Sequence, residues 1–270
     1  MDEQLYTKRA LIVVRTYPTP AKSGVEVSCT AAITDRGEWL RLFPVPWRLL
    51  PEEKRFRKYQ WIEAQVIKAR KDDRPESYKL LHDTIKIVSE PLSNADGWKA
   101  KKAVIASLQA PSLCHLKRVR DEKGFPTLGI FRPKRIERLV ISETESDWTP
   151  GQQAILRQGH LFERRPEKIL EKIPFDFQYQ FFCDDPTCVK GHKLICTDWE
   201  MGESWRAWRQ KYGSGWEAKF RQRYETDMVQ KLDTHFYVGT MHRYPDIWII
   251  VGLFYPPRLE PPVPSLFGNM

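Results

Sequence analysis

Three cysteines and one histidine fall within fourteen residues in the second half of the sequence: Cys183, Cys188, His192 and Cys196. Thiolate sulfur and imidazole nitrogen are the ligands that zinc prefers, and four such ligands complete its tetrahedron. Because protein would fill all four positions, the site would be structural, with no open position for a reacting water. The sequence therefore predicts a zinc hook at residues 183–196. The alternative is a set of buried free thiols beside an unrelated histidine.

Two carboxylates, Asp198 and Glu200, follow this cluster closely. On a strand, residues two apart point to the same side, so the pair could share a Mg²⁺ or Mn²⁺ ion as in a nuclease. A nuclease core would also place a lysine near its second carboxylate, and this order of residues lacks one. The other interpretation puts Glu200 in the first turn of a helix, where a negative charge meets the positive end of the helix dipole. We favour this second interpretation.

Basic residues are concentrated between residues 101 and 138, where ten of them stand against three acidic ones. Most of the net charge of +9 therefore lies in a short part of the chain. A concentrated positive field attracts polyanions through counterion release, and a scattered excess does so far less. The pattern favours nucleic-acid binding over a solvated loop region. The expected phosphate contacts are Lys117, Arg118, Arg120, Arg132, Lys134 and Arg135.

Other catalytic chemistry has little support. Cys114 adjoins His115 in the basic stretch, and the two could form a reactive pair or add a fifth metal ligand. No carboxylate that would orient the imidazole can be identified, so we expect an ordinary surface or core histidine. The sequence has no phosphate loop, serine elbow, His-Glu-x-x-His or dinucleotide-binding glycine pattern, which disfavours the common nucleotide, hydrolase and protease classes.

The elements that would position these side chains begin with β-structure. Short strands are expected at residues 10–15, 25–34, 38–43, 61–68 and 84–89. Asp35-Arg36-Gly37 joins the second strand to the third, and a three-residue loop that ends on glycine is typical of a hairpin. Five short strands separated by turn residues favour a small closed or half-closed barrel of the OB or SH3-like class.

The stretch Cys29-Thr-Ala-Ala-Ile-Thr-Asp-Arg-Gly-Glu-Trp-Leu-Arg-Leu-Phe-Pro-Val-Pro46 resembles the opening hairpin of bacterial proteins described as having dual OB-type domains. In that family a strand of small residues, a turn with glycine and a strand with tryptophan, arginine and proline follow one another. The resemblance extends over about residues 25–68, and Leu42-Phe43 departs from the family's pattern. It implies an OB-type fold and nucleic-acid binding, and it assigns no catalytic residues.

Helices and strands follow one another in the rest of the chain. The expected elements are a helix at 94–109, strands at 127–131 and 135–142, a helix capped by Thr149, a strand at 175–181, helices at 202–211 and 214–231, and strands at 235–240 and 247–254. Residues 158–172 are charged and lack periodicity, so they are the expected linker between two halves.

The composition favours a cytoplasmic location. Five cysteines is an odd number, which suits a metal site in a reducing compartment better than a disulfide framework. No run of apolar residues is long enough to span a bilayer, and the N-terminus lacks the layout of a secretory signal.

These features predict an α+β protein in three parts: a β-rich barrel-like domain with the basic region at 1–157, a zinc-hooked α+β domain at 173–257, and a proline-rich tail at 258–270. Prolines restrict the tail, and its Leu266-Phe267 pair suits either a peptide that docks on a protein partner or a terminal arm packed on its own domain. We expect the protein to bind DNA or RNA within a bacterial genome-maintenance or defence system. The alternatives are a metal-dependent nuclease that uses Asp198 and Glu200, and a scaffold subunit of a larger complex.

Overall fold

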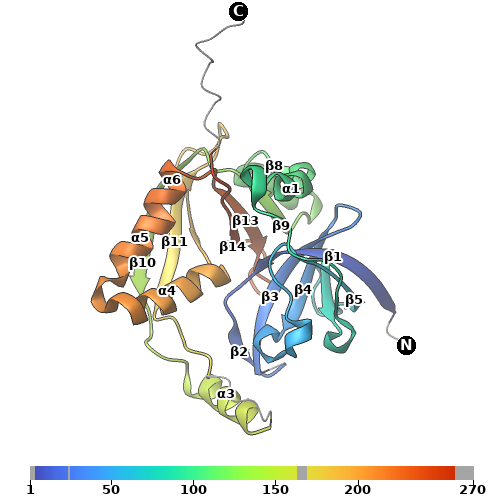
Figure 1. Ribbon diagram of the computed structural model, residues 1–270. Helices are drawn as coiled ribbons and strands as arrows, with labels where there is room; N and C mark the ends of the chain where they lie inside the picture. Colours follow the sequence, from blue (N-terminus) through green and yellow to red (C-terminus); the bar gives the residue numbers. More distant parts are fainter. Residues whose placement is uncertain (1–3, 24, 163–168, 259–270) are drawn as a thin grey trace, which may run out of the picture.

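The structure, a computed structural model, describes residues 4–23, 25–162 and 169–258 (Figure 1). The strands are β1 (Leu5–Arg15), β2 (Thr19–Ala21), β3 (Val25–Thr34), β4 (Trp39–Val45), β5 (Trp61–Lys68), β6 (Ser77–Leu80), β7 (Lys86–Ile87), β8 (Gln109–Ala110), β9 (Leu128–Phe131), β10 (Arg135–Glu143), β11 (Phe175–Phe182), β12 (His192–Ile195), β13 (His235–Thr240) and β14 (Trp248–Phe254). The helices are α1 (Ala95–Ile105), α2 (Leu113–Lys123), α3 (Pro150–Phe162), α4 (Trp199–Tyr212), α5 (Trp216–Arg221) and α6 (Met228–Gln230), with a π-helical turn between the last two. The fold is therefore mixed α+β. Within the described ranges, no helix is both long and apolar enough to cross a membrane.

Five strands close into a barrel in the N-terminal region. β1 pairs with β3 on one side and with β5 on the other, and the order β1-β3-β4-β6-β5 returns to β1. Residues 10–14 of β1 are all buried, as expected of a strand that is covered on both faces. Alternate residues of the neighbouring strands, such as Ile62, Ala64 and Val66 of β5, fill the interior. The predicted closed barrel is confirmed.

The fifth strand of the barrel is not the expected one. Residues 84–89 hold only the short β7, which pairs with one end of β5. The position between β4 and β5 belongs to β6, which runs parallel to β4 and antiparallel to β5. Four residues are too few to display a periodic pattern, so this strand gives no clear signal in the sequence.

The predicted hairpin at residues 35–37 is confirmed by the pairing of β3 with β4. The Thr34 amide donates to the Glu38 carbonyl across the turn at 2.9 Å. Gly37 has φ of +76°, in the left-handed region that glycine adopts without strain. Because no atom lies within 4 Å of the position of a Cβ, the backbone conformation and not the space requires glycine here.

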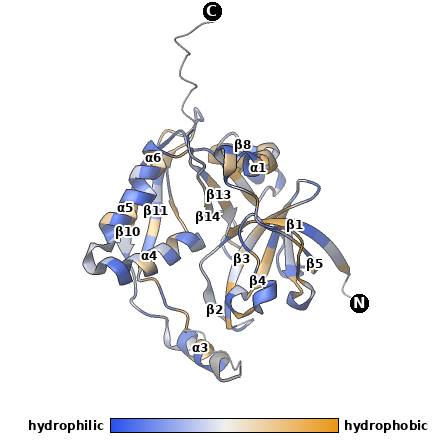
Figure 2. Cartoon of the chain, viewed as in Figure 1, coloured by the Kyte–Doolittle hydropathy of each residue, from blue (hydrophilic) through white to orange (hydrophobic). Residues whose placement is uncertain are grey.

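Two further sheets build the other half of the molecule, one with the order β10-β11-β12 and one with the order β14-β13-β9-β8. The alternation predicted at 175–181 is confirmed in β11, where Phe177, Tyr179 and Phe181 are buried. Helices α4 and α5 bring further aromatic rings to this core, and the rings of Phe177 and Phe220 stack with centroids 4.4 Å apart. The outward side of α4 and α5 is largely hydrophilic (Figure 2).

The strand pairing places the boundary between the two halves of the molecule before residues 158–172. β9 and β10 precede that segment, yet they pair with β13 and β11, which follow it. In its sheet pairing, the chain from β8 onward therefore belongs to the C-terminal half, including the part of 1–157 that follows α1. Residues 163–168 of the expected linker, and all but the first residue of the expected docking tail, lie outside the described residues.

Helix α2, between β8 and β9, is an element that the sequence does not indicate. The Ser112 hydroxyl caps it by accepting a hydrogen bond from the His115 amide at 2.9 Å, and Gly124 ends it in the left-handed conformation. Leu113 and Leu116 are its buried side chains, too few to form an apolar stripe. This helix carries Cys114 and also Lys117, Arg118, Arg120 and Lys123 of the basic stretch.

Candidate functional site

The structure gathers a Cys₃His group that could bind a metal ion: Cys114, Cys183, Cys188 and His192. Their ligand atoms all lie within 4.8 Å of one another, and the Cys114 Sγ is 3.2 Å from the His192 Nε2. In a tetrahedral site with metal–sulfur bonds of about 2.3 Å, the ligand atoms are about 3.5–4 Å apart. The group therefore has the donor set and the dimensions of a four-coordinate metal site.

Three elements bring these ligands together. Cys114 lies in the first turn of α2, and Cys183 and Cys188 lie in the connection that follows β11. His192 begins β12, directly after Gly191. Glycine is required there because its φ is +66° and an added Cβ would lie 2.9 Å from the carbonyl oxygen of Phe181.

Asp185 joins α2 to the same connection. Its carboxylate accepts hydrogen bonds from the Ser112 hydroxyl at 3.0 Å and from both terminal nitrogens of Arg118 at 3.2 and 2.9 Å. The Arg118 guanidinium and the hydrogen bonds from Thr187 hold the pKa of Asp185 well below its usual range. The carboxylate is therefore ionised and fixes the start of the helix beside the ligands.

Burial governs the protonation of the ligands when no cation is present. It raises the pKa of the Cys183 thiol to about 12. Burial, together with the Lys117 ammonium, lowers the pKa of His192 to about 4, so the imidazole is neutral and ready to bind a metal. A divalent cation would instead lower the pKa of the cysteine thiols, because it stabilises thiolates directly.

The structure gives the fourth position to Cys114, and not to Cys196 as the sequence predicts. Cys196 is buried in the aromatic core, and its amide donates to the Phe177 carbonyl at 2.7 Å. β12 begins at His192, and Cys196 directly follows its last residue. These four steps of extended chain cover about 13 Å. The strand therefore carries Cys196 out of reach of a metal that His192 binds.

Carboxylates pair with most of the residues predicted to contact phosphates. The ion pairs are Arg118 with Asp185, Arg120 with Asp121 and Asp246, Arg132 with Asp233, Lys134 with Asp184, and Arg135 with Glu137, at 2.6–3.1 Å. Several of these acids lie far along the chain or outside the segment 101–138. The basic stretch therefore presents less free positive charge than its composition suggests.

Asp198 is the N-cap of α4 and Glu200 lies in its first turn, so the helix-start interpretation is confirmed. The two Asp198 oxygens accept hydrogen bonds from the amides of Glu200 at 2.7 Å and Leu253 at 2.9 Å. Lys58 of the barrel region lies between the carboxylates, with its Nζ 3.6 Å from Asp198 and 3.4 Å from Glu200.

The ion pairs of this cluster link the barrel region to the C-terminal half. Burial alone would lower the pKa of Lys58, but Asp198 and Glu200 outweigh that effect and raise the pKa above its usual range. The cavity beside these side chains has a volume of about 30 Å³, enough for a water molecule but not for a phosphodiester. The geometry therefore fits a partly buried ion-pair network better than the active site of a nuclease.

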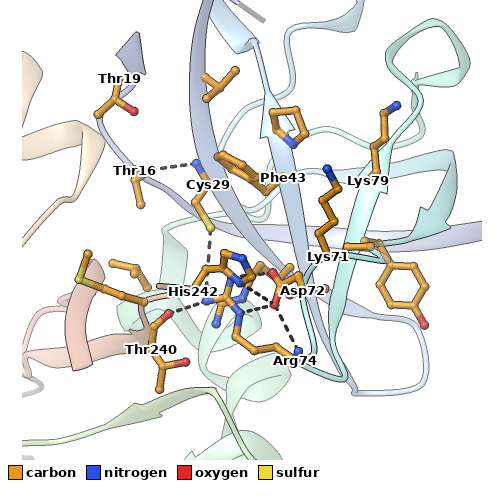
Figure 3. Close-up of a pocket in the computed structure, with 18 of the residues that line it drawn as sticks. Thr16, Thr19, Cys29, Phe43, Lys71, Asp72, Arg74, Lys79, Thr240 and His242 are labelled. Atoms are coloured by element: carbon orange, nitrogen blue, oxygen red, sulfur yellow. Dashed lines mark hydrogen bonds and ion pairs between the residues drawn. The ribbon is translucent and has the colours of Figure 1, made fainter. Parts of the chain in front are cut away.

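A larger pocket, of about 720 Å³, opens between the barrel and the C-terminal half (Figure 3). Its barrel wall includes parts of β3, β4 and β6, the end of β5, residues 16–19 after β1, and residues 69–74 between β5 and β6. The opposite wall includes Thr197, residues 240–242 at the end of β13, and part of β14. The pocket is thus formed by segments from both halves of the sequence.

Two arginines fix these walls to each other. Arg41 donates to the Thr127 carbonyl at 2.9 Å, and Arg74 donates to the Thr240 carbonyl at 2.5 Å. Asp72 accepts hydrogen bonds from the Arg74 Nε and Nη2 at 2.8 and 2.6 Å. Burial alone would raise the pKa of Asp72, but Arg74 outweighs it and holds that pKa well below its usual range. These hydrogen bonds therefore hold the two halves together around the pocket.

The lining of this pocket is strongly cationic. Its basic side chains are Arg41, Lys68, Arg70, Lys71, Arg74, Lys79 and His242, and its one carboxylate is Asp72. Lys71 and Lys79 are exposed, and no residue in the described ranges forms an ion pair with either. Apolar surface lies beside them, since Phe43 is 46% exposed and Met241 is 37% exposed. The pocket can therefore attract an anion and also contact a flat apolar group.

Sequence reasoning missed the pocket entirely. Its clearest signal is the run Lys68-Ala-Arg-Lys-Asp-Asp-Arg74, which places four cations directly at and after the end of a strand. The second wall could not be recognised because it comes from residues far along the chain.

The fold and sites define an α+β protein that combines a closed five-stranded barrel with a Cys₃His group. A family model described as domain of unknown function (DUF8757) matches residues 109–270, and a second, domain of unknown function (DUF8758), matches residues 6–107. Because the first covers more than half of the chain, the protein belongs to the DUF8757 family. The boundary between the two matches agrees with the division that strand pairing indicates. No curated protein matches the sequence.

Proposed function

We propose that the protein binds nucleic acid, DNA or RNA, in the pocket between the barrel and the C-terminal half. The observation that carries this proposal is the combination of free lysines, Lys71 and Lys79, with the exposed ring of Phe43 in one cavity. Nucleic acid offers phosphates to the first and flat base faces to the second. Proteins that bind single strands combine cationic grooves and aromatic side chains in this way.

The topology of the barrel supports this location. Within the barrel, β1, β3, β4, β5 and β6 are the first to fifth strands, and their order around the ring is first, second, third, fifth, fourth. The third and fifth strands pair in parallel. We infer an OB-type barrel, a class that binds oligonucleotides and oligosaccharides on its second and third strands and on the loops after its first and fourth. All four of these elements line the pocket, so the fold supports the site by analogy.

We also propose that the metal of the Cys₃His group is zinc. Three thiolates and one imidazole form a donor set that selects zinc among the common divalent ions, and four protein ligands leave no position for a substrate. None of the four ligands lines the pocket. We therefore assign the ion a structural role, in which it holds α2 against the end of β11 and the start of β12.

Two matched double variants test the binding site. Lys71→Ala with Lys79→Ala removes two cations from the pocket, and Lys134→Ala with Arg135→Ala removes two from the basic stretch. The affinity for a labelled single-stranded oligonucleotide is measured by fluorescence anisotropy over a range of salt concentrations. Each phosphate contact on a single strand contributes about 0.7 to the slope of log affinity against log salt, so the pocket variant should lose about 1.4. The control variant should keep the slope of the parent protein.

The opposite pattern, with the slope lost only in the Lys134 and Arg135 variant, would move the interface to the basic stretch. Equal slopes for the parent and both variants would exclude the two lysines of the pocket. If the parent protein binds no oligonucleotide at low salt, the proposed function is wrong.

A further inference from the structure

The C-terminal half covers the barrel face on which an open groove would otherwise lie. Residues 240–242 lie across the pocket from Phe43 and Lys71 (Figure 3). Beside β2, the Tyr17 amide donates to the Thr197 carbonyl at 2.8 Å and joins the two walls. A single strand that crosses an open OB face spans about 4–16 nucleotides. The pocket therefore has walls from both halves of the molecule, unlike the open face of an isolated OB barrel.

The volume of the pocket limits the size of its occupant. About 720 Å³ falls within the range of roughly 300–1,000 Å³ that is typical of pockets for one small molecule. The bases of a duplex remain paired and stacked, so a base can enter such a pocket only after it leaves the stack. The space therefore suits one nucleotide and excludes a double helix.

The side chains of the pocket match the parts of a nucleotide. The half-exposed Phe43 ring offers a face on which a base can stack, and Lys71 and Lys79 offer charges for a phosphate. Arg41 also lines the pocket, and its Nε is buried without a hydrogen-bond partner in the described part of the chain. The protein itself encloses this donor, so recognition of a base in the pocket depends on Phe43 and not on the Arg41 Nε.

We propose that the pocket binds a single unpaired nucleotide, with its base against Phe43 and its phosphate near Lys71 and Lys79. This inference rests on the proposed function, since it specifies which form of nucleic acid the same pocket accepts. The nucleotide can come from a strand end or from an internal position at which the base has left the stack, and both sources present the same chemistry to the pocket.

Competition with thymidine 5′-monophosphate tests the size of the ligand. The mononucleotide should displace a labelled linear oligo(dT), whereas a blunt duplex should bind the parent at least tenfold more weakly than the single strand. Phe43→Ala should weaken binding of the mononucleotide and of the single strand about tenfold, near the lower end of the effect of one base–aromatic stack. The matched control is Phe125→Ala, because Phe125 is also an exposed phenylalanine before a proline and does not line the pocket.

Alkylation of Cys29 by iodoacetamide provides a readout in the parent protein, so it does not depend on the folding of a variant. Cys29 lines the pocket, with its Sγ 3.9 Å from the Arg41 Nη1. The other four cysteines belong to the Cys₃His group or to the buried core. Bound mononucleotide should slow the alkylation of Cys29, and a blunt duplex should not.

Equal affinity for the single strand and the duplex, with no displacement and no protection of Cys29 by the mononucleotide, would overturn the inference while nucleic-acid binding remained. If no probe binds at all, the proposed function fails together with it. A circular oligo(dT) distinguishes the two sources, and both results support the pocket: equal binding of circle and linear strand indicates an internal nucleotide, and loss of binding indicates a strand end.

Discussion

Replacing Cys114 with alanine should remove the metal ion and much of the stability that it provides. Cys114 and His192 are 78 positions apart in the chain, so a metal ion that binds both acts as a crosslink over a long loop. In the chain-entropy treatment, closing a loop of this length restricts the unfolded chain by about 4.5 kcal/mol. Cys183, Cys188 and His192 would remain, and three ligands are too few for a four-coordinate structural site. We therefore expect Cys114→Ala to lower the free energy of unfolding of the zinc-loaded protein by about 4 kcal/mol.

Cys196→Ala is the matched control, because it removes a buried thiol that lies outside the group. The resulting small cavity should lower the free energy of unfolding by about 1 kcal/mol, with zinc unchanged at one ion per chain. Urea denaturation is measured with zinc and with a chelator, and elemental analysis gives the zinc content. In chelator the difference between the parent and Cys114→Ala should nearly vanish, since neither chain then contains the crosslink. The loss in Cys196→Ala should persist in both conditions.

The reverse result would refute this reasoning. If Cys114→Ala retained one zinc ion per chain while Cys196→Ala lost it, the ligand set predicted from the sequence would be correct. A parent protein that binds no zinc after metal repletion would end the zinc assignment altogether.

Three further changes test other parts of the structure. Lys58→Met should lower the free energy of unfolding by about 3–5 kcal/mol, because Asp198 stays buried without its cation. Urea denaturation at neutral pH measures this change. A negligible change would show that the ion pairs of Lys58 do not stabilise the fold. The pKa of Asp72 lies below its ordinary value, so the stabilisation by its charge is present above about pH 4 and is lost as the pH falls below it. Asp72→Asn should accordingly be less stable than the parent at neutral pH, and the two should converge in acid; a constant difference across this range would contradict the role of the charge. Gly191→Ala should weaken zinc binding about tenfold, because the new Cβ would crowd the Phe181 carbonyl beside His192. Competition with a chromophoric chelator measures the zinc affinity. An unchanged affinity would mean that this turn tolerates a side chain.

Elements with a strong local pattern could be predicted from the sequence. The strands predicted at 25–34, 61–68 and 235–240 have the same bounds as β3, β5 and β13. Alternation of apolar residues is a property of neighbours in the chain, so it is visible without the fold. The short β6 is different, because its place in the barrel depends on parallel pairing with β4, and no local signal encodes that partner.

The sites depend on contacts that spacing along the chain does not encode. Three metal ligands were predictable because they lie within ten residues of one another in the chain, but the fourth is brought to them by the packing of α2. The field of the basic stretch was overestimated because Asp233 and Asp246, which pair with it, lie about a hundred residues downstream. Formal charge can be counted from a sequence, whereas ion pairing becomes visible only in the folded chain.

The pairing of β9 with β13 has a consequence for the order in which the protein folds. All five strands of the barrel lie within the first 80 residues, so they can pair while the rest of the chain is still being synthesised. Residues 128–131 of β9 can pair with residues 236–239 of β13 only after β13 has been synthesised. Until then, the edge of β9 that faces β13 stays unpaired. We expect pulsed hydrogen exchange during refolding to protect the amides of β1 and β3 before those of β9 and β13. The central sheet of the second half can form only when nearly the whole chain is present, so we expect this half to be the more prone to misfolding during synthesis.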